Sequence, residues 1–154
     1  SSLLVFKNDD AYMRKFSNDL WINNYEYSKN LRLQQPKEHV YDGKLFVLIN
    51  GLTFSSGSAL AADLKKTTNA IFIGEESGGV FEGPTGGNSI VIQLPNSKIM
   101  VRISPQIHVG YKYQKHPFGR GVFPDYLIEY TIEDVLNGRD LEMEKAIDLI
   151  SRQE

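Results

Sequence analysis

Residues 44–66 constrain the fold of this chain more than any other segment. They read KLFVLINGLTFSSGSALAADLKK, an apolar run followed by a turn and an alanine-rich stretch. The apolar run at 45–49 predicts a strand buried on both faces, and the alanines predict a helix over 56–66 that packs closely on a sheet. Ser55 and Ser56 therefore stand at a helix N-terminus, where free backbone N–H groups attract anions. An acyl-transfer nucleophile needs that position, but helix capping alone also explains both serines.

The segments that follow predict how the strands pair. Residues 69–75 (NAIFIGE) predict a second strand. A strand, helix and strand in about 30 residues form a crossover unit, in which the strands are parallel. The alternating runs at 89–94 and 99–103, joined by the turn Pro95–Lys98, predict a β-hairpin, and 107–113 reads as a further strand. These patterns predict an α/β fold with a parallel βαβ core.

The two ends of the chain carry their own signals. Apolar residues near i, i+4 and i+8 predict a helix over 12–22, and residues 25–36 read as a loop. Thr131 predicts the N-cap of a short helix that Gly138 ends. Asp140 predicts the cap of a last helix, whose apolar stripe is Met143, Ile147 and Ile150.

Composition narrows the function classes. The chain has 154 residues, 41% of them hydrophobic, which suits one globular domain. Its formal net charge of −2 gives no reason to expect a nucleic-acid partner, and no apolar run approaches the ~18 residues of a membrane span. The absence of cysteine excludes thiolate nucleophiles and cysteine-held zinc. The three histidines lack metal-ligand spacing, so no metal site is expected. No other cofactor is expected either.

Three segments, taken in order, resemble the C-terminal-processing and tricorn-type serine peptidases. They are 53–58 (TFSSGS) between strand and helix, 70–79 (AIFIGEESGG) after the helix, and 121–125 (GVFPD) with the helical segments at 131–147. The resemblance covers roughly residue 44 to the C-terminus. It implies a ClpP/crotonase-like α/β fold and cleavage of peptide bonds through an acyl-enzyme.

The resemblance implies catalytic roles for the two serines. Ser55 falls on the family's nucleophile, 19 residues before Gly74 and in the family's Thr-x-Ser pattern with Thr53. The N–H of Ser56 would then be one oxyanion donor. If the register shifts by one residue, Ser56 is the nucleophile instead.

The resemblance also implies partners. The substrate would be a peptide or an unfolded protein, with Gly78, Gly79 and Val80 lining its groove; a plain hairpin connection explains this glycine-rich loop equally well. Homo-oligomers and an exported or periplasmic location in a bacterium are expected by resemblance only. No cofactor is implied.

The chain departs from the family at several positions. Val80 stands where a Ser/Lys dyad would have its lysine, Ser58 where some relatives have an acidic residue, and Phe118 near the place of a glutamate. The histidine base and the second oxyanion loop of tricorn-type members come from upstream of the nucleophile strand, and neither is recognisable in residues 1–43. We therefore expect one N-terminally incomplete peptidase domain, with residues 1–43 as a variable lead-in and 44–154 as the family-like core. These 154 residues alone are expected to be inactive or nearly so.

Other side chains have simpler explanations. His39, His108 and His116 are candidates for the base, but each reads first as an ordinary surface or packed histidine. Glu82 reads as an exposed loop carboxylate, and Lys65–Lys66 as the solvated end of a helix.

Two other functions stay open. A catalytically inactive peptide-binding or assembly module would keep the fold and explain the missing lysine and acidic residues. An acyl-CoA enzyme of the crotonase type would share the fold, but the serine motif and the C-terminal segments do not suit it.

Overall fold

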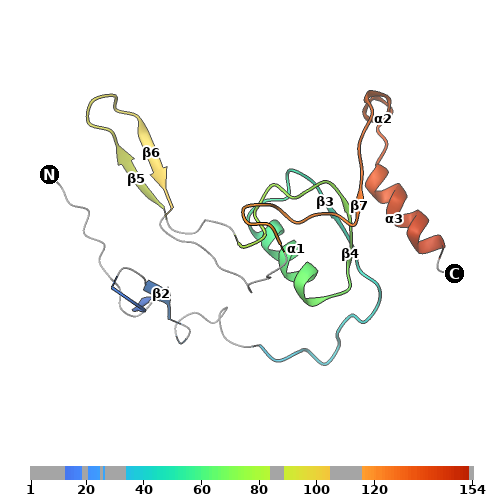
Figure 1. Cartoon of the computed structure of the whole chain (residues 1–154), viewed down its shortest axis with the longest axis horizontal. Coiled ribbons are helices and arrows are strands. Elements are labelled where there is room, and N and C mark those ends of the chain that lie inside the picture. Colours follow the sequence, from blue (N-terminus) through green and yellow to red (C-terminus); the bar gives the residue numbers. More distant parts are fainter. Residues whose placement is uncertain are drawn as a thin grey trace. The chain divides into compact units, whose positions relative to one another are not determined.

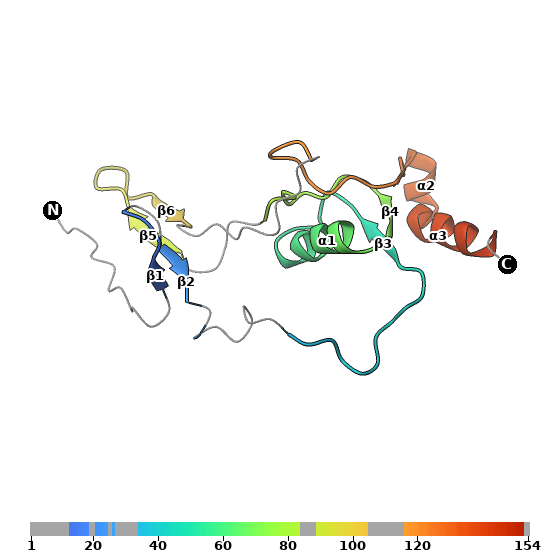
Figure 2. The ribbon, with the colours of Figure 1, turned by 60° about the horizontal axis from the view of Figure 1, so that its bottom comes forward.

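The computed structural model describes residues 13–18, 21–24, 26, 34–83, 89–104 and 116–152. The chain divides into two compact units, residues 1–42 and 43–154, whose elements are labelled in Figures 1 and 2. The second unit carries the serine turn.

A short hairpin forms in the first unit. Strand β1 (Met13–Lys15) pairs antiparallel with β2 (Trp21–Asn23), with Arg14 opposite Ile22. The helix predicted over 12–22 is therefore wrong. Ser17 and Asn18 lie between the strands, and such residues favour turns over helix interiors because their side chains bond nearby backbone groups.

The predicted βαβ unit is confirmed in the second unit. Strand β3 (Phe46–Ile49) leads through helix α1 (Ser56–Thr67) to β4 (Ile71–Gly74), and the two strands are parallel. A third strand, β7 (Tyr126–Leu127), pairs parallel with the other edge of β4. No local pattern predicted β7, because two residues are too few to show a period.

The core lies between α1 and one face of this sheet. Ala61 and Ala62 of α1 are buried against Phe72 of β4, so the alanine-rich helix packs as predicted. Leu48 of β3 points to the other face and is 39% exposed, so the prediction that this strand is buried on both faces is wrong. Figures 1 and 2 show α1 and α3 on opposite sides of the sheet.

The predicted β-hairpin is also confirmed. Strand β5 (Ile90–Gln93) pairs antiparallel with β6 (Met100–Ile103). Lys98 closes the turn with a φ of 60°. The strand predicted at 107–113 lies outside the described residues, as does most of the loop predicted at 25–36.

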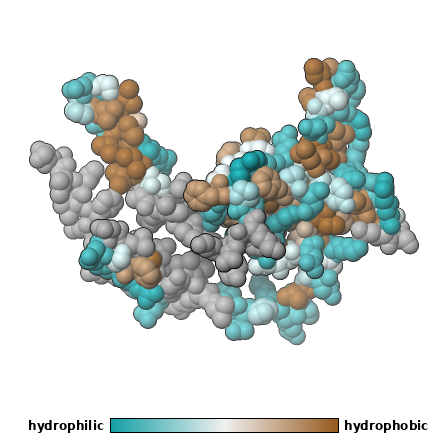
Figure 3. Space-filling model, in the orientation of Figure 1, coloured by the Kyte–Doolittle hydropathy of each residue, from teal (hydrophilic) through white to brown (hydrophobic). Residues whose placement is uncertain are grey.

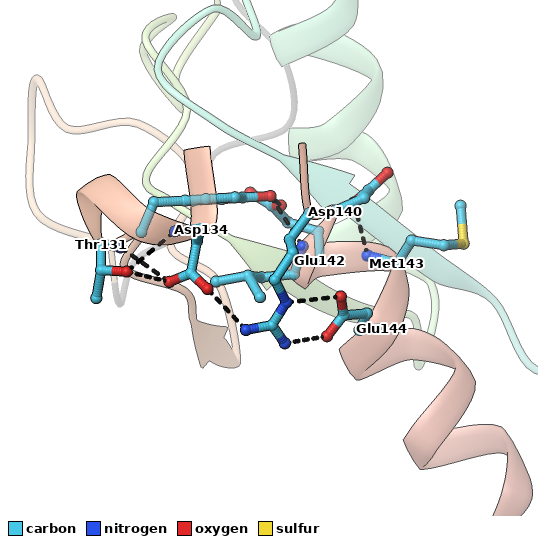
Figure 4. Close-up of polar contacts among 9 residues, drawn as sticks. Thr131, Asp134, Asp140, Glu142, Met143 and Glu144 are labelled. Carbon is cyan, nitrogen blue, oxygen red and sulfur yellow. Dashed lines mark hydrogen bonds and ion pairs between the residues drawn. The ribbon is translucent and has the colours of Figure 1, made fainter. Parts of the chain in front are cut away.

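Two helices follow β7. Helix α2 (Ile132–Leu136) begins with a capping box between Thr131 and Asp134, and α3 (Leu141–Ser151) is capped by Asp140, both as predicted. Figure 4 shows these caps, with Glu144 also drawn. No described helix is long and apolar enough to cross a membrane.

The apolar stripe predicted for α3 is not its buried face. Ala146 is the buried residue of this helix, whereas the three stripe residues are about half exposed: Met143, Ile147 and Ile150. Figure 3 shows apolar side chains gathered over the α2 and α3 region.

Candidate active site

Ser55 lies at a sharp turn between β3 and α1. Its φ of 52° and ψ of −123° fall in a region that L-residues rarely adopt. Its side chain makes no capping hydrogen bond, and the residue is exposed. N-capping therefore does not explain this serine. A strained strand-to-helix turn that presents a serine hydroxyl to solvent is the geometry of a nucleophile elbow.

The peptide between Ser55 and Ser56 has a fixed orientation. The Ser55 carbonyl accepts hydrogen bonds from the N–H of Ala59 (3.0 Å) and from Ser58 Oγ (2.9 Å). Because C=O and N–H point in opposite directions in a trans peptide, the Ser56 N–H points away from the helix. It has no hydrogen-bond acceptor among the described residues. A free donor is thus beside the exposed hydroxyl.

The residues before Ser55 form a network of short-range hydrogen bonds. Thr53 N–H donates to the Asn50 carbonyl (2.9 Å), and Asn50 N–H donates to Thr53 Oγ1 (3.1 Å). The Asn50 side chain also accepts from Leu52 N–H (2.9 Å). The role of Asn50 was not predicted from the sequence, although an Asn-Gly pair after a strand is a recognisable turn signal.

Gly78 and Gly79 pack directly against this turn. The Gly79 N–H donates to the Thr53 carbonyl (3.1 Å). A Cβ on Gly79 would come within 2.1 Å of Ser58 Oγ, and one on Gly78 within 2.2 Å of the Gly51 carbonyl. Close backbone approach thus accounts for both glycines. The Gly79 amide is already used inside the protein, so its predicted contact with substrate would need another atom.

Val80 and Glu82 hold the loop to the segment before β7. Val80 forms an isolated antiparallel bridge with Gly121, and Glu82 accepts from the Gly119 N–H (3.1 Å). The substrate groove predicted for Gly78, Gly79 and Val80 stays a prediction, because residues 84–88 lie outside the described part.

The segments at 76–79 and 120–125 are bonded to each other in the structure. Glu76 forms an ion pair with Arg120 and accepts from the Gly121 N–H (2.7 Å). The hydrogen bond from Arg120 is the main reason that the pKa of Glu76 falls to about 2. Ser77 Oγ, which is buried, accepts from the Val122 N–H (2.8 Å) and donates to the Gly79 carbonyl (2.9 Å). The family-like segments thus bind one another beside the serine turn.

The two lysines at the end of α1 are not simply solvated, which corrects the prediction. The Lys66 side chain is only 2% exposed; its Nζ donates to the Phe81 carbonyl (3.3 Å) and lies over the Phe81 ring. Lys65 forms an ion pair with Asp125. Asp125 in turn accepts from the Phe72 N–H of β4 (2.8 Å). Both cations therefore help to fasten α1 to the core.

None of the histidines that the structure describes is bonded to the serine turn. His116 stacks on Phe81 with ring centroids 4.0 Å apart, and its Nε2 is buried without a hydrogen-bond partner. His39 belongs to the other unit, and His108 lies outside the described residues. Among the described residues, Ser55 and a free N–H donor therefore lie together without a histidine bonded to the turn.

A shallow pocket of about 560 Å³ lies at the end of β3 near α2 and α3. Three of its polar side chains already have partners. Glu142 is hydrogen-bonded to Tyr130, and Arg139 forms ion pairs with Asp134 and Glu144. Ser55 is not part of its lining. The described residues hold no cluster of three or more potential metal ligands.

Comparisons with known proteins concern the fold and the family of the chain. No curated protein matches the chain. Among solved structures, a crystal structure of the tricorn protease superposes with a TM-score of 0.51 at 23% identity. The match covers 78% of this chain and 12% of that chain, so the chain spans a small part of the tricorn protease. At this identity the likeness shows the fold alone.

The sequence model of peptidase family S41 matches residues 6–128. The match begins upstream of residue 44, where the resemblance read from the sequence started, and ends before α2 and α3. It contains the serine turn, the two glycines and the 121–125 segment. Since it covers most of the 154 residues, the chain belongs to peptidase family S41.

Proposed function

We propose that this chain carries the nucleophile of a serine-type endopeptidase with a ClpP/crotonase-like fold, and that Ser55 is that nucleophile. The observation that carries the proposal is the backbone of Ser55, whose positive φ presents an exposed, uncapped hydroxyl beside the free N–H of Ser56. Strain of this kind costs about 1–3 kcal/mol and persists where function requires it. Family membership supplies the reaction class.

In the first step of the proposed reaction, the Ser55 hydroxyl and the Ser56 N–H act together. Ser55 Oγ attacks the peptide carbonyl while its proton passes to a base, and the carbonyl oxygen becomes an oxyanion that accepts a hydrogen bond from Ser56 N–H. One such donor typically contributes about 3 kcal/mol to the transition state. Collapse of the adduct expels the amine, which takes up the proton that the base holds, and leaves the acyl-enzyme, which water then hydrolyses.

Apolar side chains next to Ser55 support a peptide substrate. Leu52 and Phe54 flank the turn and are 84% and 55% exposed. Exposed apolar side chains beside a nucleophile offer contacts for the side chains of an extended peptide. The exported location and the homo-oligomer rest on the resemblance alone.

A fluorophosphonate probe tests the proposal on the full-length protein. We expect covalent labelling at Ser55, found by peptide mass mapping, and loss of both labelling and peptide hydrolysis in Ser55→Ala. Ser56→Ala keeps the backbone donor and should keep labelling, which separates Ser55 from the alternative nucleophile. Ser151→Ala, an exposed serine on α3, is the control. Peptide hydrolysis that survives Ser55→Ala would refute the assignment.

An inactive peptide-binding module is the second candidate. The observation that favours it is the lack of a hydrogen-bonded base at Ser55 among the described residues. Peptide binding that is unchanged in Ser55→Ala, with no covalent adduct on the wild-type protein, would select this alternative.

A further inference from the structure

Ser58 is a fully buried serine three residues after the proposed nucleophile. It lies in the first turn of α1 and has no exposed surface. A buried hydroxyl is unfavourable unless it is hydrogen-bonded. Ser58 Oγ donates to the Ser55 carbonyl at 2.9 Å, so among the described residues this hydroxyl bonds the residue with the strained backbone.

This bond acts on the peptide that carries the oxyanion donor. The Ser55 carbonyl is held from two directions, by Ser58 Oγ and by the Ala59 N–H. Rotation of this peptide would break both bonds, and it would also turn the Ser56 N–H away from solvent, because the two groups share one rigid plane. The Ser58 hydroxyl thus stabilises the one orientation in which the donor is available.

The loop after β4 encloses the Ser58 side chain. A Cβ on Gly79 would lie 2.1 Å from Ser58 Oγ and 2.6 Å from Ser58 Cβ. The Gly79 N–H is bonded to the Thr53 carbonyl, which fixes the loop at that distance. The Ser58 hydroxyl is therefore confined and shielded from water, and a bond shielded from water orients its acceptor more firmly.

We infer that Ser58 is a positioning residue, whose hydroxyl holds the Ser55–Ser56 peptide so that the Ser56 N–H faces the developing oxyanion. The inference rests on the proposed function of Ser55. Ser58 contacts neither substrate nor reacting atoms; it acts through the Ser55 carbonyl.

The test measures the rate of fluorophosphonate inactivation of the full-length protein. In this reaction Ser55 Oγ bonds to phosphorus, fluoride leaves and the hydroxyl proton passes to the base, while the phosphonyl oxygen takes up charge near the donor. Ser58→Ala should lower the maximal inactivation rate about tenfold or more, since loss of a whole donor costs about 100-fold or more. The probe concentration at half-maximal rate should not change, because ground-state binding is not affected.

Ser77→Ala is the matched control. Ser77 is also a buried serine in this region, but its hydroxyl bonds Gly79 and Val122 rather than Ser55. The Ser77→Ala variant should lose about as much stability as Ser58→Ala and should react at a rate close to that of the wild type. Ser58→Cys keeps a side chain of similar shape with a weaker donor and should react at an intermediate rate. This variant decides the question if circular dichroism shows that Ser58→Ala is unfolded.

The outcomes separate this inference from the proposed function. If the wild-type protein is not labelled at Ser55, the proposed function fails and the inference fails with it. If the wild type is labelled but folded Ser58→Ala and Ser58→Cys both react at its rate, the inference alone is overturned. A change confined to the half-maximal concentration would also overturn it, since that would place Ser58 in probe binding.

Discussion

At the scale of single residues, the backbone of Ser55 makes a prediction about stability. Glycine adopts a positive φ without strain, whereas alanine retains the strain of serine. The strain costs about 1–3 kcal/mol and the added flexibility of glycine costs about 0.5–1 kcal/mol. Ser55→Gly should therefore be more stable than Ser55→Ala by about 1 kcal/mol, measured by urea unfolding.

Ser56 is the matched control for this comparison. It is the first residue of α1 and does not have a positive φ. Here the order should reverse, with Ser56→Gly less stable than Ser56→Ala by up to about 1 kcal/mol. Equal stabilities of the two Ser55 variants would argue that the turn relaxes and stores no strain.

The sequence was informative about single residues where their role is local. Ser55 follows an apolar strand and precedes an alanine-rich helix, so its place at the turn was predictable. The roles of Ser58, Gly79 and Lys66 depend on which distant backbone packs against them. That information is not carried by neighbouring residues, so the helix-end interpretation of Lys66 was wrong.

At the scale of elements, the Glu76–Arg120 ion pair joins the end of β4 to the segment before β7 and makes stability depend on pH. Its hydrogen bond lowers the pKa of Glu76 from 4.5 to about 2 in the folded protein. The unfolded chain therefore binds more protons between these values, and the stability that the pair contributes is lost as pH falls from about 4.5 to 2. Because Arg120 is about half exposed, the contribution should be about 1 kcal/mol or less.

The measurement is the thermal midpoint of wild-type protein and Glu76→Gln across this range. The variant should be less stable than wild type at pH 6, and the difference should shrink as the pH falls toward 2. Glu75→Gln is the control, since no described ion pair involves Glu75. A difference between wild type and Glu76→Gln that is constant over the range would contradict the assigned pKa.

Predictability also varied among elements. The βαβ unit, the β5–β6 hairpin and both helix caps follow from local patterns, and all are confirmed. Strand β7 pairs through Asp125, whose N–H donates to the Phe72 carbonyl (2.7 Å) and whose side chain accepts from the Phe72 N–H. A two-residue strand that is fixed by long-range contacts leaves no periodic signal in the sequence. The segment at 12–22 fits a helix by spacing, yet its central Ser17 and Asn18 favoured the turn.

At the scale of the whole molecule, the lack of a described base at Ser55 leads to the last prediction. The described residues place an exposed serine beside one free N–H donor, but no described histidine or lysine is bonded to Ser55. A general base typically contributes about 10²–10⁴-fold to such reactions. If, as we propose, the base comes from a longer protein that contains this chain, the 154-residue chain alone should react with a fluorophosphonate at least about 100-fold more slowly than that longer protein.

The experiment must distinguish a folded chain that reacts slowly from a chain that does not fold. Circular dichroism should first show that the chain alone is folded. Added imidazole should then accelerate its labelling by acting as the base, and should have no effect on Ser55→Ala. Labelling of the chain alone at the rate of the full-length protein would show that the base lies within it. His39→Ala, His108→Ala and His116→Ala would then identify that base. His116 would be the first to examine, because its buried Nε2 has no partner.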